Sequence, residues 1–307
     1  MVSVGAVIGG AFRLFRERPG AVAIWGLIYA AVGAVGSYFV VQPLTRGTLI
    51  GVSPGQAFAA LIPYYFGLLL VMLVLSAASV RAVLRPEERS FASLRIGMDE
   101  VRLFGLAAMM LIAYFVFMIV FVIIISMLMG VMMVGVGAGM GAGAGSGSVS
   151  GIASIVVIVV LLYLVILAAL SFVWVRFSLV GALTILRRKI IIGESWTATR
   201  RNFWRLFAAY LVIGVIMLAL YVLAAAVTMG PYLPTLIEGG FSRDALQEAS
   251  QAQMQLQMGG LSPALVLSWI AQALIGATSF AMWGGAAATA TQALVGPSVD
   301  DYAATFE

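Results

Sequence analysis

The densest group of residues that could bind a charged ligand lies between Arg176 and Phe207. Seven residues of this segment are cationic, and it also contains two tryptophans. The candidate ligand-binding residues are Arg176, Arg201, Arg205, Trp196 and Trp204. An arginine guanidinium is a planar fork that can hold a phosphate through two hydrogen bonds, and tryptophan favours the headgroup level of a bilayer. The combination predicts a binding site for phospholipid headgroups.

Two other interpretations of these cations stay open. Lys and Arg accumulate on the cytoplasmic side of membrane proteins and orient them, so the same residues could act only as topology determinants. Glu194, in the same segment, could also neutralise the arginines. The sequence does not separate these interpretations from lipid binding.

Other residues offer little catalytic chemistry. The acid pairs Glu87-Glu88 and Asp99-Glu100 stand beside arginines, so we expect solvated ion pairs rather than an acid–base or metal site. The chain has no cysteine and no histidine, which removes thiol nucleophiles and the commonest zinc ligands. We therefore expect no catalytic residues, no metal and no cofactor.

Composition places the candidate site in a membrane protein. The chain of 307 residues is 63% hydrophobic and only 9% charged, with a mean hydropathy of +1.11. A soluble domain would carry about a quarter charged residues. The net charge of +5 is the excess of Lys and Arg that orients membrane proteins, so nucleic acid is not an expected partner.

Six apolar runs reach the roughly 20 residues that a helix needs to cross the bilayer core. They run from about Ala21 to Val41, Pro54 to Val80, Leu103 to Leu128, Ile152 to Trp174, Leu206 to Val227, and Pro263 to Val295. Ser53-Pro54 and Ser262-Pro263 are typical helix starts, and Gly296-Pro297 is a typical stop. The prediction is an all-α polytopic membrane protein with six transmembrane helices.

The six spans form three helical hairpins within a single membrane domain, 1–307. The hairpin repeats cover about 1–82, 83–178 and 179–296, and an acidic tail follows at 297–307. An amphipathic interfacial helix is expected before each hairpin: over 3–18, over Ser90 to Glu100, and in the segment from Arg176 to Phe207.

Two segments between spans have distinct compositions. Residues 130–151 are so rich in glycine that we expect a flexible connector rather than a helix. Their GAGMGAGAG run follows no strand and lacks the lysine of a phosphate-binding loop. Residues 229–261 leave the membrane, and we expect a helix over SRDALQEASQAQMQLQM.

Small residues recur at every fourth position of the sixth span. This seam consists of Ala277, Ala281, Gly285, Thr289 and Ala293. Small residues let helix backbones approach closely in a membrane, so we expect helix packing here and a central sixth helix. A substrate path along the seam is the alternative.

The distribution of cations predicts the orientation. Fifteen of the 17 Lys and Arg residues lie at the N-terminus or in the connectors after the second and fourth spans, and Arg46 and Arg243 are the exceptions. Both termini are therefore expected in the cytoplasm.

Three motifs of the Arg176–Phe207 segment give a family resemblance. They are Arg176-Phe-Ser-Leu, Glu194-Ser-Trp and Arg201-Asn-Phe-Trp-Arg-Leu-Phe207. The segment resembles the bacterial YciC-like proteins and the membrane domain found with glycerophosphoryl diester phosphodiesterases. The resemblance implies a six-span protein of the bacterial inner membrane. It implies no phosphodiesterase activity, because the chain has no fused hydrolase domain.

Two function classes follow. We expect a non-enzymatic membrane-organising or accessory protein that contacts anionic lipid at its cytoplasmic face. The alternative is a transporter or channel for a hydrophobic or lipid-like substrate. The expected partners are membrane phospholipids, with a protein partner or a second copy of the chain as further possibilities.

Overall fold

The computed structural model describes residues 2–36, 53–87, 91–95, 97–140, 148–230, 233–240, 242–258 and 263–296. Across these ranges the chain is helical, without any strand. Six of the described helices are long and apolar enough to cross a membrane. The predicted all-α fold with six candidate transmembrane helices is confirmed. The predicted end of the first span at Val41, the Ser262 cap and the tail 297–307 lie outside the described residues.

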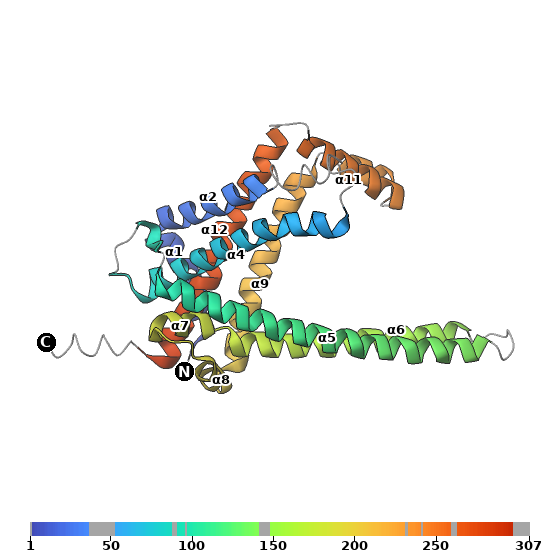
Figure 1. The fold of residues 1–307 in the computed structure, drawn as a ribbon, viewed down its shortest axis with the longest axis horizontal. Helices are drawn as coiled ribbons and strands as arrows, with labels where there is room; N and C mark the ends of the chain where they lie inside the picture. Colours follow the sequence, from blue (N-terminus) through green and yellow to red (C-terminus); the bar gives the residue numbers. More distant parts are fainter. Residues whose placement is uncertain are drawn as a thin grey trace.

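The helices follow one another along the chain as hairpins and short connectors (Figure 1). The long helices are α2 (Pro19–Gly36), α4 (Pro54–Leu84), α5 (Met98–Met140), α6 (Ser148–Phe177), α9 (Phe203–Met229) and α12 (Pro263–Val295). The shorter elements are α1 (Val4–Glu17), the 3₁₀ turn η2 (Phe91–Ser93), α7 (Val180–Arg187), α8 (Ile192–Arg200), α10 (Leu233–Glu238) and α11 (Arg243–Met258).

Helix α12 lies at the centre of the molecule and packs against α1, α2, α4 and α9. Close approach is possible because small residues meet at the crossings. A Cβ at Gly285 would lie 2.5 Å from the Gly10 carbonyl oxygen, and one at Gly26 would lie 2.8 Å from the Ala277 Cβ. Since no side chain fits at these two glycines, the helix backbones are in direct contact there.

The seam residues of α12 follow this central contact in order. Ala277 faces α2, Gly285 and Thr289 face α1, and Ala281 is fully buried. Ala293 is exposed, so the seam ends before the last turn of the helix.

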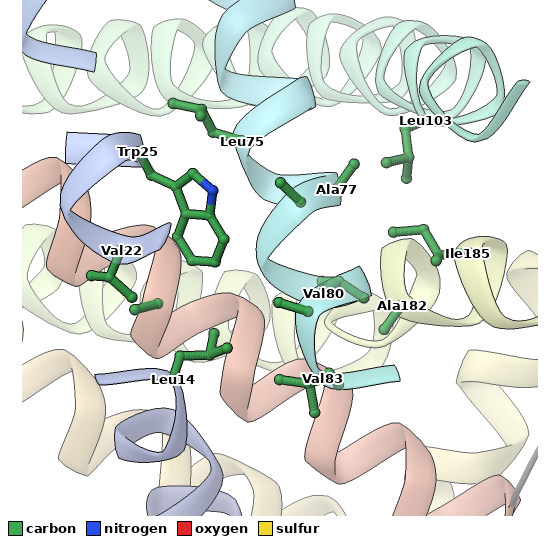
Figure 2. Close-up of a cluster of buried hydrophobic side chains, with 14 of the residues drawn as sticks. Leu14, Val22, Trp25, Leu75, Ala77, Val80, Val83, Leu103, Ala182 and Ile185 are labelled. Atoms are coloured by element: carbon green, nitrogen blue, oxygen red, sulfur yellow. The ribbon is translucent and has the colours of Figure 1, made fainter. Parts of the chain in front are cut away.

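The apolar core on the α2 and α4 side surrounds Trp25, which is fully buried (Figure 2). Figure 2 shows the Trp25 indole between Val22 and Leu75, with Leu14 below it. The indole Nε1 donates a hydrogen bond to the Ala92 carbonyl of η2 at 2.9 Å. This bond ties the connector after α4 to the first transmembrane helix.

Three local predictions need correction. Ser90 to Glu100 does not form a separate surface helix: its described residues form η2, a short non-helical link and the first turn of α5. The Gly-rich connector is shorter than predicted, because α5 continues to Met140 and α6 already begins at Ser148. Between Arg176 and Phe207 the chain forms two short helices, α7 and α8, instead of one.

Helix α1 is amphipathic as predicted, but its apolar face packs on protein rather than resting only in the membrane interface. Val7, Ala11 and Leu14 are buried against the helical core. Phe12 keeps 41% of its surface exposed and can still reach lipid.

Helices α5 and α6 form a long hairpin that extends away from the other helices (Figure 1). In the most apolar part of α5 only 6% of the residues are buried, and in α6 only 11%. Their exposed side chains are almost all aliphatic or aromatic. These surfaces suit lipid contact, because lipid tails are as apolar as the side chains.

Candidate lipid-headgroup site

A cavity of about 870 Å³ lies between α6, the end of α8 and the start of α9. It has a cationic end and an apolar end. The cationic residues are Arg176, Arg200, Arg201 and Arg205, and the aromatic residues are Phe172, Phe203, Trp204 and Phe207. Leu164, Leu167 and Ala168 of α6 line the apolar end. The cavity thus combines anion-binding groups with a hydrophobic wall.

Arg176 is the buried cation of this cavity, with only 8% of its surface exposed. Its guanidinium carbon lies 4.9 Å from the Phe172 ring centroid, 5.1 Å from that of Trp196 and 5.6 Å from that of Phe203. Cation–π attraction of this kind stabilises a desolvated cation by about 2 kcal/mol. The three rings therefore supply part of the stabilisation that water gives to an exposed arginine.

Hydrogen bonds fix α8 against the end of α6 and so position Arg176. The Arg176 Nη1 donates to the Trp196 carbonyl at 3.3 Å and to the Thr199 hydroxyl at 3.5 Å. The Ser195 hydroxyl donates to the Arg176 carbonyl at 2.7 Å. The Arg176 Nε is buried and has no hydrogen-bond partner among the described residues.

The remaining three arginines are exposed. Arg205 donates from Nη1 to the Val2 carbonyl at 3.4 Å, which links the start of α9 to the N-terminal segment. Arg200 and Arg201 make no ion pair within the described part of the chain. Glu194, the expected competitor, instead accepts a hydrogen bond from Arg187 at 3.2 Å. No carboxylate is among the described residues that line the cavity.

The cavity brings together four of the five residues singled out from the sequence. Arg176, Arg201, Arg205 and Trp204 line it, while Trp196 lies beside it and stacks on Arg176. The spacing of four residues between Arg201 and Arg205 predicts that they share a face of one helix entering the fifth span. The structure corrects this, because α8 ends at Arg200 and α9 begins only at Phe203.

Sequence reasoning missed Arg200, Phe172 and Phe203 as site residues. The break between α8 and α9 turns Arg200 into the cavity together with Arg201. The aromatic spacing gave a usable signal, since Phe172 lies four residues before Arg176 and faces the same side of α6.

A second cluster of charged side chains joins α4 to α5. Arg81 forms an ion pair with Glu100, and Asp99 pairs with Arg85 at 3.3 Å and with Arg102 at 2.9 Å. Glu100 is only 7% exposed. The prediction that Asp99-Glu100 is a solvated surface pair is therefore wrong.

The charged groups of this second cluster pair with one another, although the buried Arg81 Nε has no hydrogen-bond partner among the described residues. Glu100 also accepts a hydrogen bond from the Gly97 amide at 2.9 Å, and Arg81 donates to the Arg95 carbonyl at 3.2 Å. In the described part of the chain, no three His, Cys, Asp or Glu residues gather in a way that could hold a metal ion. The cluster is thus a structural link between two transmembrane helices.

The arginine-lined cavity has the features of an anion site at a membrane surface. Among the described residues no acid pairs with its cations, and the adjoining wall is apolar. An amphipathic anion could place its charge at the arginines and its apolar part along α6. Comparison of the chain with protein-family models, with curated proteins and with solved structures gave no match.

Proposed function

We propose that this protein is a non-enzymatic, multi-pass protein of the bacterial inner membrane that binds anionic phospholipid at its cytoplasmic face. In this role it would organise the membrane or act as an accessory to other membrane proteins. The observation that carries the proposal is the cavity lined by four arginines and no described carboxylate.

Electrostatics favour an anionic lipid over a zwitterionic one. Each basic residue near an anionic leaflet contributes about 1 kcal/mol of attraction. A zwitterionic headgroup brings a cation along with its phosphate and would meet repulsion from the same arginines. Arg176 adds a buried positive charge to this cavity, stacked on aromatic rings and with no carboxylate among the described lining residues.

The proposal is tested by the lipids that the purified protein retains. In native mass spectrometry, Arg200→Gln with Arg201→Gln should lower retention of phosphatidylglycerol relative to phosphatidylcholine by about thirtyfold, since two attractions of about 1 kcal/mol are lost. Arg13→Gln with Arg16→Gln is the matched control, because it removes the same charge from exposed positions of α1 outside the cavity. Equal lipid selectivity of the two double variants would contradict the proposal.

Transport of a hydrophobic or lipid-like substrate is the second candidate function. A separate apolar cavity of about 290 Å³ lies between α9 and α12. The arginine-lined cavity is at the start of α9, whereas this one is near its end, so the two could hold a lipid-like substrate at different depths. The described residues that line the cavity between α9 and α12, such as Leu223, Val227 and Leu274, include no charged side chain. Movement of a fluorescent phospholipid between leaflets of proteoliposomes would distinguish transport from binding alone.

A further inference from the structure

A second cavity adjoins the arginine-lined one at the contact between α6 and α9. It has a volume of about 310 Å³ and shares Ser171 and Phe207 with the first cavity. Its other lining residues include Trp174, Gly214 and Leu218, and none of them is charged. We call this space the α9 track, and the apolar end of the first cavity the α6 track.

The two tracks start together and then follow different helices. The first cavity follows α6 from Arg176 to Leu164, which is about 18 Å at the rise of an α-helix. The α9 track extends from Phe207 to Leu218, which is about 16 Å. Helix α9 leaves the α5–α6 hairpin at a steep angle (Figure 1). The geometry is therefore one cationic end with two diverging apolar branches.

Aromatic contacts hold the branch point. The Phe172 and Phe203 ring centroids lie 5.2 Å apart, and those of Trp174 and Tyr210 are also 5.2 Å apart. Both pairs join α6 to α9 close in sequence to the shared residues Ser171 and Phe207. The two tracks therefore diverge from a fixed contact.

We infer that the ligand is a glycerophospholipid with two acyl chains, one in each track. This inference rests on the proposed function and adds the number of chains to it. The phosphate lies among Arg176, Arg200 and Arg201, and the glycerol lies beside Ser171 and Phe207. A soluble phosphate compound would use neither track, and a single-chain lipid would leave one track empty.

The tracks contribute less to binding affinity through the number of acyl chains than the arginines contribute through the charge of the headgroup. A chain that leaves a track enters lipid or detergent, which is equally apolar, so only packing contacts are lost. We therefore expect a blocked track to weaken two-chain binding by about fivefold, equivalent to about 1 kcal/mol.

Gly214→Leu is the variant that tests the α9 track. A Cβ at Gly214 would meet no atom within 4 Å, so the new side chain enters the track without displacing the protein. Gly67→Leu in α4 is the matched control, because a Cβ there also meets nothing within 4 Å and Gly67 lines neither track. Ala168→Leu tests the α6 track independently, and the neighbouring Ala169→Leu is its control.

The experiment measures displacement of phosphatidylglycerol from the full-length protein in detergent. The competitors are glycerol phosphate, lyso-phosphatidylglycerol with one chain and dioleoyl-phosphatidylglycerol with two. For the wild type we expect the two-chain lipid to compete best and glycerol phosphate worst. Gly214→Leu and Ala168→Leu should each weaken the two-chain lipid by about fivefold and leave the one-chain lipid unchanged, because one free track is enough for it.

Two results would overturn the inference. If one-chain and two-chain lipids bind the wild type equally, or if neither track variant changes two-chain binding, the two-track site is wrong while anionic lipid binding stands. If phosphatidylglycerol binds no better than phosphatidylcholine, the proposed function and the inference are both wrong.

Discussion

At the scale of single residues, the buried arginines Arg81 and Arg176 have different surroundings. Arg81 lies beside Glu100, so the charge is neutralised inside the protein. Arg176 is also buried but is surrounded by aromatic rings, a hydroxyl and a carbonyl, with no carboxylate among its described neighbours. The first arrangement links two helices, whereas the second leaves a positive charge available to a ligand.

The buried pair gives a prediction about stability. Glu100→Gln keeps the size of the side chain but leaves the charge of Arg81 without its counter-ion. Breaking a buried ion pair from one side costs about 3 kcal/mol or more. We expect a clear fall in the thermal unfolding temperature of the detergent-solubilised protein.

Glu17→Gln is the control for this measurement. Glu17 pairs with Arg13 at 2.8 Å, but its side chain is 54% exposed, and exposed pairs contribute less than about 1 kcal/mol. Similar unfolding temperatures for the two variants would show that the Arg81–Glu100 pair is not buried as described.

The sequence identified the arginines of the candidate site more easily than its aromatic wall. A concentration of arginine between two apolar spans is visible from composition alone, and Arg176, Arg201 and Arg205 all line the cavity. The rings of Phe172 and Phe203 come from two helices that meet only after folding. Apart from the spacing of Phe172 to Arg176, the apolar residues of a span do not reveal which of them face a cavity and which face lipid.

At the scale of helices, the crossing of α1 over α12 predicts opposite changes in stability for alanine at two neighbouring glycines of α1. A Cβ at Gly10 would collide with the Thr289 side chain, whereas one at the neighbouring Gly9 would meet nothing within 4 Å. Gly10→Ala should therefore destabilise the protein by about 1–3 kcal/mol through overpacking. Gly9→Ala should stabilise it by roughly 0.5–1 kcal/mol, because alanine favours the helix more than glycine does.

The two variants are compared by thermal unfolding in the same detergent. They carry the same substitution at adjacent positions of one helix, so differences in expression or in detergent binding are minimised. If Gly10→Ala unfolds at or above the temperature of Gly9→Ala, the backbone contact between α1 and α12 is not as close as described.

Helix boundaries were predictable where their signals are local. Ser53 accepts a hydrogen bond from the Gln56 amide and completes a capping box, and α12 ends where Gly296 takes a positive φ of 81°. The turn η2 has no such local signal. Ala92 and Ser93 adopt φ of 52° and 56°. The Ala92 carbonyl accepts a hydrogen bond from Trp25, and the Ser93 hydroxyl accepts one from Arg18, both far back in the sequence. Contacts of this range do not appear in a local pattern.

Glycine content misled the prediction for the end of α5. Each glycine weakens a helix by about 1 kcal/mol relative to alanine in water. In an apolar environment an unpaired backbone group costs several kcal/mol, so the helix is retained despite its glycines. This difference explains why α5 continues to Met140.

At the scale of the whole molecule, the cationic connectors lie on one side. In Figure 1, α7 and α8 lie next to each other at the lower left with α1 above them, and α11 lies away from all three at the upper right. Of the 17 cationic residues, Arg46 and Arg243 are the two that the sequence assigns to the other side. The cationic side therefore corresponds to the cytoplasmic face in the proposed orientation.

Labelling of single cysteines tests this orientation. The chain has no cysteine, so each introduced thiol reports one position only. Thr197 in α8 and Ser250 in α11 are both exposed and lie on the two predicted sides. In intact cells, a membrane-impermeant maleimide should label Ser250→Cys from the outside and should label Thr197→Cys only after the membrane is opened.

Because α8 carries Arg200 at its end and stacks Trp196 on Arg176, labelling of both cysteines from the outside would place the arginine-lined cavity on the outer face. That result would overturn the cytoplasmic orientation, whereas lipid binding at the cavity is decided separately by the lipids that the purified protein retains.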